Sequence, residues 1–283
     1  MHSTHSIPLR HRPPLVLGPR ALVMGILNVT PDSFSDGGRH DRVDAALAHA
    51  RLMLAEGADI LDIGGESTRP GAEPVGVEQE LDRVVPVIEA IRAAGIAVPI
   101  SIDTMKPPVA DRAIEAGADI VNDVNGLQGA PEMAGIAARH QAPVIAMHWD
   151  RGWTAATGPL PAMVRYFERT LAIAETAGID AARVVLDPGF GFTKTLDQNY
   201  GILRQLADLK NSFPKNALLV GTSRKSMIGR LLDNQPHERL PGTIATSVQG
   251  YERGGHIFRV HDVAPNRDAL RVAEATLYGP GRT

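Results

Sequence analysis

Short apolar segments alternate with longer helical patterns along most of the chain. The short segments are rich in Val, Ile and Leu and end in polar, Gly or Pro residues, which is typical of strands buried on both faces. They occupy residues 21–27, 59–63, 98–102, 119–123, 143–147, 183–187, 217–221 and 256–260. Helical spacing of apolar residues covers 44–57, 78–95, 107–118, 161–178, 199–213, 242–254 and 263–279. Glycine recurs at the ends of these patterns, as expected of helix stops.

The alternation of strands and helices predicts a parallel α/β sheet. Repeated strand–helix units of this kind, over roughly 260 residues, favour a closed (β/α)₈ or TIM barrel in a single domain. An open, doubly wound sheet is the alternative. We expect residues 21–283 to form the barrel and residues 1–20 to form a partly flexible N-terminal segment.

Composition narrows the classes of function. The chain has 283 residues, of which 43% are hydrophobic and 22% charged, as in a packed globular protein. A net charge of −3 argues against binding to nucleic acid or to an anionic membrane. The absence of cysteine excludes disulfides, thiolate metal sites and a cysteine nucleophile. No apolar run resembles a signal peptide or a membrane span, so we expect a soluble, cytoplasmic protein.

Polar clusters follow the predicted strands or close them. They are NVTPDSFSDGG, GGESTRPG, DT, NDVNG, MH, DPGFGF, TSRKS and RVHD, in chain order. In a barrel, the carboxyl-terminal ends of all strands share one rim, where catalytic loops gather. Residues far apart in sequence therefore converge there, which predicts an enzyme.

Acidic and amide groups recur at this rim. Asp103 closes the third strand, Asn122 and Asp123 close the fourth, and Asp187 closes the sixth. Buried carboxylates are costly unless they are paired or hydrogen-bonded, and they accept well from the ring nitrogens and amine of a heterocycle. The alternative is helix capping, since Asp103 and Asp187 each precede a turn and Asp is a good N-cap. We favour the ligand-binding interpretation.

Cationic groups recur at the same rim. Arg259 and His261 are two residues apart, so both point to one face of the last strand, where barrels often bind phosphate. The SRKS segment (223–226) opens a predicted helix, and a helix N-terminus with Lys225 nearby suits a carboxylate or a phosphate. Its spacing is not that of a P-loop, and GFGFTK (189–194) is not a dinucleotide fingerprint.

Two further loops offer ligand groups. Asn28 begins NVTPDSFSDGG, a long loop with Asp32 and Asp36, and its amide oxygen is a suitable ligand for Mg²⁺. Thr68 and Arg69 of GGESTRPG can hydrogen-bond an anion. The alternatives are an ordinary turn for the first loop and a solvated arginine for the second. No His or carboxylate metal cluster and no Gly-x-Ser-x-Gly elbow is present.

Together these segments resemble the dihydropteroate synthase family. MGILNVTPDSFSDGG, GADILDIGGESTRPGAEPV, SIDTMKP, AGADIVNDVNG, VVLDPGFGFTKTLDQNY, VGTSRKSMIG and HIFRVHDV match that family's motifs in order, over about residues 20–278. The resemblance implies condensation of 6-hydroxymethyl-7,8-dihydropterin diphosphate with p-aminobenzoate, dependent on Mg²⁺, in folate biosynthesis. It also implies a dissociative reaction in which the arylamine traps a pterin cation, inhibition by sulfonamides, and a homodimer.

The resemblance further implies a role for individual residues. The pterin would be bound by Asp103, Asn122, Met147, Asp187 and Lys225. The diphosphate would be bound by Thr68, Arg69, Arg259 and His261, and its Mg²⁺ by Asn28. The p-aminobenzoate would be bound by Pro70, Phe192 and Ser226.

One segment departs from the family pattern. After Met147 and His148, the family carries a Gly-x-Pro-x-Thr-Met-Gln-like stretch, whereas this chain has WDRGWTAATGPLP with Trp149 and Trp153. We therefore expect this loop to differ in shape. This difference in the loop is the only support for one alternative function, that of a non-catalytic pterin-binding paralogue. A pterin-dependent methyltransferase is a second alternative, but it needs no diphosphate site, and Arg259 and His261 argue against it.

Overall fold

The computed structural model describes residues 2, 4–30, 39–67, 73–150, 152 and 158–281. Eight parallel strands form the main sheet, in the order β8-β7-β6-β5-β4-β3-β10-β9. A parallel bridge between Leu186 and Leu218 connects the two ends of this order, which closes the barrel. The strands are β3 (Leu22–Asn28), β4 (Ile60–Gly64), β5 (Ile100–Asp103), β6 (Ile120–Asp123), β7 (Val144–Met147), β8 (Val184–Asp187), β9 (Leu219–Val220) and β10 (Ile257–Val260). The predicted (β/α)₈ barrel is confirmed, and the open sheet is excluded.

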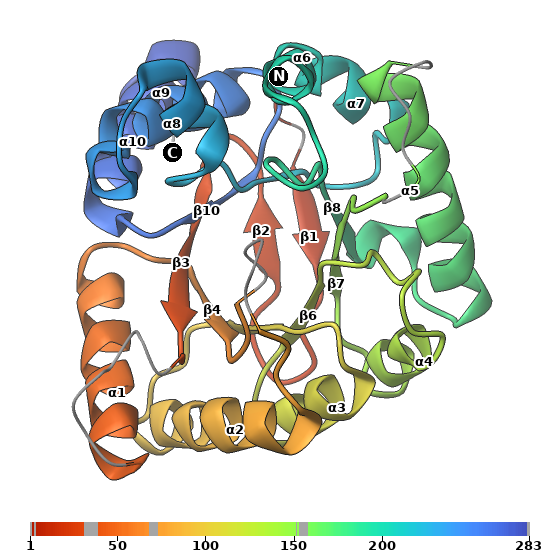
Figure 1. The fold of residues 1–283 in the computed structure, drawn as a ribbon, viewed down its shortest axis with the longest axis vertical. Coiled ribbons are helices and arrows are strands. Elements are labelled where there is room, and N and C mark those ends of the chain that lie inside the picture. The colour runs from red at the N-terminus through yellow and green to blue at the C-terminus, as the bar shows by residue number, and fades with distance from the viewer. Residues whose placement is uncertain are drawn as a thin grey trace.

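Helices surround the strands as an outer ring (Figure 1). They are α1 (Arg39–Ala55), α2 (Val77–Ala93), α3 (Pro107–Glu115), α4 (Glu132–Arg139), α5 (Pro159–Thr176), α6 (Leu196–Arg204), α7 (Leu206–Ser212), α8 (Ser226–Leu232), α9 (Leu240–Glu252) and α10 (Val263–Tyr278). In the described part of the chain, no helix is both long and apolar enough to cross a membrane.

Two helical predictions need correction. The pattern over 199–213 predicts one helix, but the chain forms α6 and α7, separated at Gln205. Leu203 and Leu206, on either side of the interruption, are both buried. Helix α4 is not predicted, because its eight residues include Gly135 and span too few turns to show a clear periodicity.

Strand side chains alternate between two buried apolar clusters. Residues such as Leu61 and Ile63 point outward and pack with Val84 and Ile88 of α2. Ile60, the residue before Leu61, points inward and belongs to an inner cluster with apolar residues of most other strands. Because each strand is buried on both faces, its sequence reads as a continuous apolar run.

A two-stranded hairpin covers the amino-terminal end of the barrel. Strands β1 (His5–Ile7) and β2 (Leu15–Leu17) pair antiparallel and appear in the middle of the ring of helices in Figure 1. Ile7 and Leu17 are buried in the inner cluster. Three-residue strands are too short to show an alternation, so the sequence pattern does not predict them. Flexibility of residues 1–20 stays a prediction.

Candidate active site

Arg259 is the centre of a hydrogen-bonded cluster that joins four strands at the carboxyl-terminal rim. Its Nε donates to Oδ2 of Asp62 at 2.6 Å, and its Nη2 donates to Oδ2 of Asp103 at 2.7 Å. Nδ2 of Asn122 donates to Oδ1 of Asp62 at 3.2 Å. These residues come from β10, β4, β5 and β6, so the barrel closure itself assembles the cluster.

The charges of this cluster depend on one another. Burial by itself lowers the pKa of Arg259, but the carboxylates of Asp62 and Asp103 raise it, so the guanidinium stays charged. Burial raises the pKa of Asp103 to about 7, with Arg259 opposing the shift and Asp62 adding to it. One cation thus faces the buried carboxylate of Asp62 and the half-buried carboxylate of Asp103, which favours a ligand that brings hydrogen-bond donors.

Asp187 and Lys225 carry opposite charges that act on each other beside the first cluster. Nζ of Lys225 donates to the carbonyl oxygen of Phe190 at 2.6 Å and lies 4.8 Å from the ring centroid of Phe192. Burial lowers the pKa of Lys225 to about 8, and the charge of Asp187 opposes this shift. Burial raises the pKa of Asp187, with Lys225 opposing, and the N–H of Gly189 donates to Oδ1 of Asp187 at 2.8 Å.

The two groups belong to one electrostatic site. Asp187 interacts with the charge of Arg259, and Lys225 interacts with the charges of Arg259 and Asp103. The structure therefore brings together five residues that the sequence places between positions 103 and 259. They are Asp103, Asn122, Asp187, Lys225 and Arg259.

Lys194 ties the loop after β8 to the end of β7. Its Nζ donates to the carbonyl oxygens of Gly189 at 2.8 Å, Phe192 at 3.1 Å and His148 at 3.2 Å. Burial lowers the pKa of Lys194 to about 7, with Asp187 opposing. The ring of Trp149 lies 5.5 Å from that of Phe192 in an edge-to-face arrangement. These contacts hold Phe192 beside Lys225.

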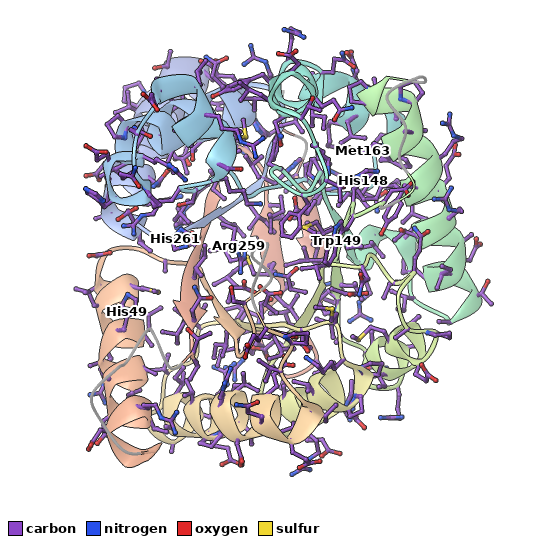
Figure 2. The ribbon with its side chains drawn as sticks, viewed as in Figure 1. His49, His148, Trp149, Met163, Arg259 and His261 are labelled. Carbon is purple, nitrogen blue, oxygen red and sulfur yellow. The ribbon has the colours of Figure 1, made fainter. Side chains whose placement is uncertain are left out.

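The end of β10 carries a second set of polar contacts. Arg259 and His261 lie close together there, whereas His148 lies across the barrel beside α5 (Figure 2). His261 shares two hydrogen bonds with Ser223, which follows β9. Arg224 pairs with Asp262, and its Nε lies 2.9 Å from Oδ2 of that carboxylate. The loops after β9 and β10 are therefore fastened to each other.

The other predicted site residues occupy different places on the rim. Asn28 is the last residue of β3, in register with Gly64, and is half-buried. Met147 ends β7 and is buried, while Ser226 begins α8 and is exposed. The remaining predicted site residues, Thr68, Arg69 and Pro70, lie outside the described residues. Positions 151 and 153–157 of the loop that departs from the family pattern also lie outside them.

The capping alternative fails for Asp103. The N-cap of α3 is Lys106, and Asp103 instead pairs with Arg259. Asp187 does stabilise the turn after β8, through its bond from Gly189, but its charge also faces Lys225. Asp123 accepts from the N–H groups of Asn125 and Leu127, so it holds its own loop.

Sequence reasoning missed Asp62 and Lys194. Asp62 is fully buried in β4 and bonded to Arg259 and Asn122. A charged residue in the middle of an apolar strand was the available signal, because such a charge needs a partner. Lys194 had no comparable signal, since a lysine in a glycine-rich loop is normally solvated. Among the described residues, no group of three or more His, Cys, Asp or Glu side chains could hold a metal ion.

Fold and site together define a (β/α)₈ barrel enzyme with an acidic and cationic centre at its catalytic rim. Residues 24–261 match the family model described as "Pterin binding enzyme". The chain is 49% identical to the dihydropteroate synthase of Escherichia coli K12 over 90% of its length and 91% of the relative's. Against the Bacillus subtilis dihydropteroate synthase, identity is 47% over 91% of this chain and 89% of the relative.

Solved structures agree with the sequence relatives. A structure of Xanthomonas albilineans dihydropteroate synthase with 4-aminobenzoic acid has a TM-score of 0.90 and 42% identity, covering 98% of this chain and 100% of that one. The same enzyme in complex with 7,8-dihydropteroate has a TM-score of 0.84 and 42% identity, covering 94% and 97%. The chain belongs to the dihydropteroate synthase family of pterin-binding enzymes.

Proposed function

We propose that the chain condenses 6-hydroxymethyl-7,8-dihydropterin diphosphate with p-aminobenzoate, giving 7,8-dihydropteroate and diphosphate. The observation that carries this proposal is the agreement between chain and relatives across almost the whole barrel, including a synthase solved with 7,8-dihydropteroate. The charged centre around Arg259 supplies the chemistry that such a reaction needs. A methyltransferase would leave the cationic groups at the end of β10 without a role.

The pterin would lie among the buried polar groups of β5, β6 and β8. The carboxylates of Asp103 and Asp187 and the amide of Asn122 can accept from the ring N–H and amine groups, with Met147 packing against the ring. Lys225 would donate to an acceptor of the same ring. Because the carboxylates are buried, they also stabilise positive charge that develops on the pterin as the leaving group departs.

The diphosphate would be bound from the end of β10. Arg259 and His261 would stabilise the negative charge that grows on the leaving oxygen, and we include Thr68 and Arg69 in this role. Asn28 fits a Mg²⁺ on the same group, because Mg²⁺ keeps waters and phosphate oxygens and needs few protein ligands. When bound, the ion would neutralise charge on the diphosphate.

The p-aminobenzoate would lie beside Phe192, near Ser226 and Pro70. The carbon–oxygen bond to the diphosphate breaks first, and the amine nitrogen then forms a bond to the methylene carbon of the resulting pterin cation. The amine then loses a proton. No side chain needs to form a covalent intermediate, so the protein contributes by positioning and by electrostatic stabilisation.

An assay of diphosphate release tests this proposal. With the pterin diphosphate and p-aminobenzoate both present, we expect release to match the formation of dihydropteroate, and a sulfonamide should compete with p-aminobenzoate. Lys225→Ala should abolish turnover because it removes the cation whose charge acts most strongly on Asp187. Failure of the wild-type protein to form dihydropteroate would reject the proposed function.

We also propose that the chain forms a homodimer. Support comes from two exposed apolar residues of α8, Leu231 and Leu232, which are 57% and 52% exposed. They line a cavity of about 570 Å³ between α6, α8 and α9. Burying such a surface favours association. Light scattering on the purified protein measures the oligomeric state, and a monomer at micromolar concentration would reject the proposal.

A further inference from the structure

Ser223 and His261 are joined by two hydrogen bonds across neighbouring loops. The backbone N–H of His261 donates to Oγ of Ser223 at 3.1 Å. Oγ of Ser223 also lies 3.0 Å from Nδ1 of the His261 ring. Ser223 is buried, with 5% of its surface exposed, so its hydroxyl has little access to water.

The hydrogens of this pair can be assigned by counting. A backbone N–H can only donate, so Oγ accepts one hydrogen from the main chain of His261. The hydroxyl hydrogen of Ser223 is then left to donate, and among the described residues Nδ1 of His261 is the acceptor bonded to this hydroxyl. A neutral imidazole carries one hydrogen, which must then be on Nε2.

The same geometry holds when the ring is protonated. Nδ1 then donates to the second lone pair of Oγ, the hydroxyl hydrogen of Ser223 rotates away from the ring, and Nε2 keeps its hydrogen. Nε2 is therefore a hydrogen-bond donor in both protonation states. His261 directly follows β10, two residues after Arg259, so both side chains lie at the carboxyl-terminal end of this strand (Figure 2).

From this geometry, and resting on the proposed function, we propose that Ser223 is a positioning residue that keeps His261 as an Nε2–H donor to the diphosphate. A fixed donor stabilises an anionic leaving group without first having to take up a proton. Reorientation is also avoided at the moment when negative charge develops.

The tautomer can be measured without substrate. Long-range ¹H–¹⁵N correlation spectra of the full-length protein distinguish Nδ1–H from Nε2–H rings, and the His261→Gln spectrum identifies the His261 signals. We expect the Nε2–H tautomer in the wild-type protein and a mixture of tautomers in Ser223→Ala. An Nδ1–H ring in the wild-type protein would overturn the proposal.

Kinetics separate positioning from a general loss of structure. In Ser223→Ala we expect the KM for the pterin diphosphate to rise about tenfold, the effect of one hydrogen bond to a charged oxygen. The KM for p-aminobenzoate should not change, and Ser223→Thr should restore the wild-type value. Ser247→Ala is the matched control, because Ser247 is a buried serine bonded to Asn266 between α9 and α10.

A double-mutant cycle gives the sharpest test. The side-chain amide of His261→Gln places an N–H near the position of Nε2 and has no tautomers. Ser223→Ala should therefore have little additional effect in the His261→Gln background. If the two effects simply add, or if Ser223→Ala changes both KM values and stability together, Ser223 is only structural and the proposal fails. If instead the wild-type protein makes no dihydropteroate while His261 is an Nε2–H ring, the proposed function fails and the tautomer assignment stands.

Discussion

The two ends of the barrel interior use the same strands for opposite purposes. On five of the strands, the inward side chains toward the amino-terminal end are apolar, and the side chains two residues further along belong to the site. The pairs are Ile60 and Asp62, Ile120 and Asn122, Ile145 and Met147, Val185 and Asp187, and Ile257 and Arg259. Side chains two residues apart share a strand face. The apolar side chains therefore form one layer of the barrel interior, and the site residues form the next layer toward the carboxyl-terminal end.

The two layers differ in what holds them together. At the amino-terminal end, Ile7 and Leu17 of the hairpin close a dry apolar cluster, which gains free energy from burial alone. At the carboxyl-terminal end, Asp62 and Arg259 lose hydration on folding, and their ion pair compensates for this loss together with Asn122 and Asp103. Mutations should therefore separate stability from activity according to the end that they affect.

The largest expected effect is that of Arg259→Ala. It removes the cation from the proposed diphosphate site, so we expect kcat/KM to fall by about 100- to 1,000-fold. It also leaves Asp62 buried without its charge partner, which should lower the free energy of unfolding by about 3–5 kcal/mol. Diphosphate release and urea unfolding measure the two quantities. Normal turnover would remove Arg259 from the mechanism.

Leu17→Ala should lower stability without lowering activity. Leu17 is 0% exposed in the inner cluster, and its truncation should lower the free energy of unfolding by about 2–5 kcal/mol. We expect kcat/KM to stay within about twofold of the wild-type value, because the rim charges keep their partners. The control is Val16→Ala, because Val16 is the neighbour of Leu17 in the same strand and its side chain is 60% exposed. Equal destabilisation by both variants would contradict a buried role for the hairpin.

The two ends should also respond oppositely to acid. At the amino-terminal end, burial lowers the pKa of His256 from 6.5 to about 3, with His2 and Lys210 adding to the shift. Below pH 6.5 His256 is protonated in the unfolded chain but stays neutral in the folded protein. The free energy of unfolding should then fall toward pH 3, by up to about 1.4 kcal/mol per pH unit.

Asp103 should act in the other direction. Its pKa is raised from 3.8 to about 7, so its contribution to stability is present at low pH and is lost as the pH rises toward 7. Urea unfolding between pH 7 and 4 tests both signs. His256→Asn, which keeps an acceptor for the N–H of Leu218, should weaken the acid loss, and Asp103→Asn should steepen it. Identical pH slopes in both variants would refute the contrast.

The smallest expected effect is that of Arg20→Ala. Arg20 pairs with Asp59 at 2.6 Å outside the amino-terminal end of the barrel, but its side chain is 46% exposed. Water and salt screen such a pair, so its loss should cost no more than about 1 kcal/mol and should be smaller still in 1 M salt. Unfolding at two salt concentrations checks this. A loss comparable to that of Leu17→Ala would mean that surface charge contributes more than expected.

The local pattern of the sequence determined the strands, most helices and the end of the barrel at which polar groups collect. Each depends on short-range properties, namely the alternation of side chains along a strand, the helical period and the glycine stops. The order of the motifs pointed to Asp103, Asn122, Asp187, Lys225 and Arg259, and the fold places all five in one charged centre.

Only the tertiary structure decided which side chains pair with one another in the site. Asp62 and Arg259 are 197 residues apart, and Ser223 and His261 are 38 apart. Nothing local in the chain says that the first strand of the barrel lies between β4 and β10, or that the hairpin closes the opposite end. Those contacts exist because closure of the sheet brings distant strands into register, and the free energy of a buried charge depends on which neighbour closure supplies.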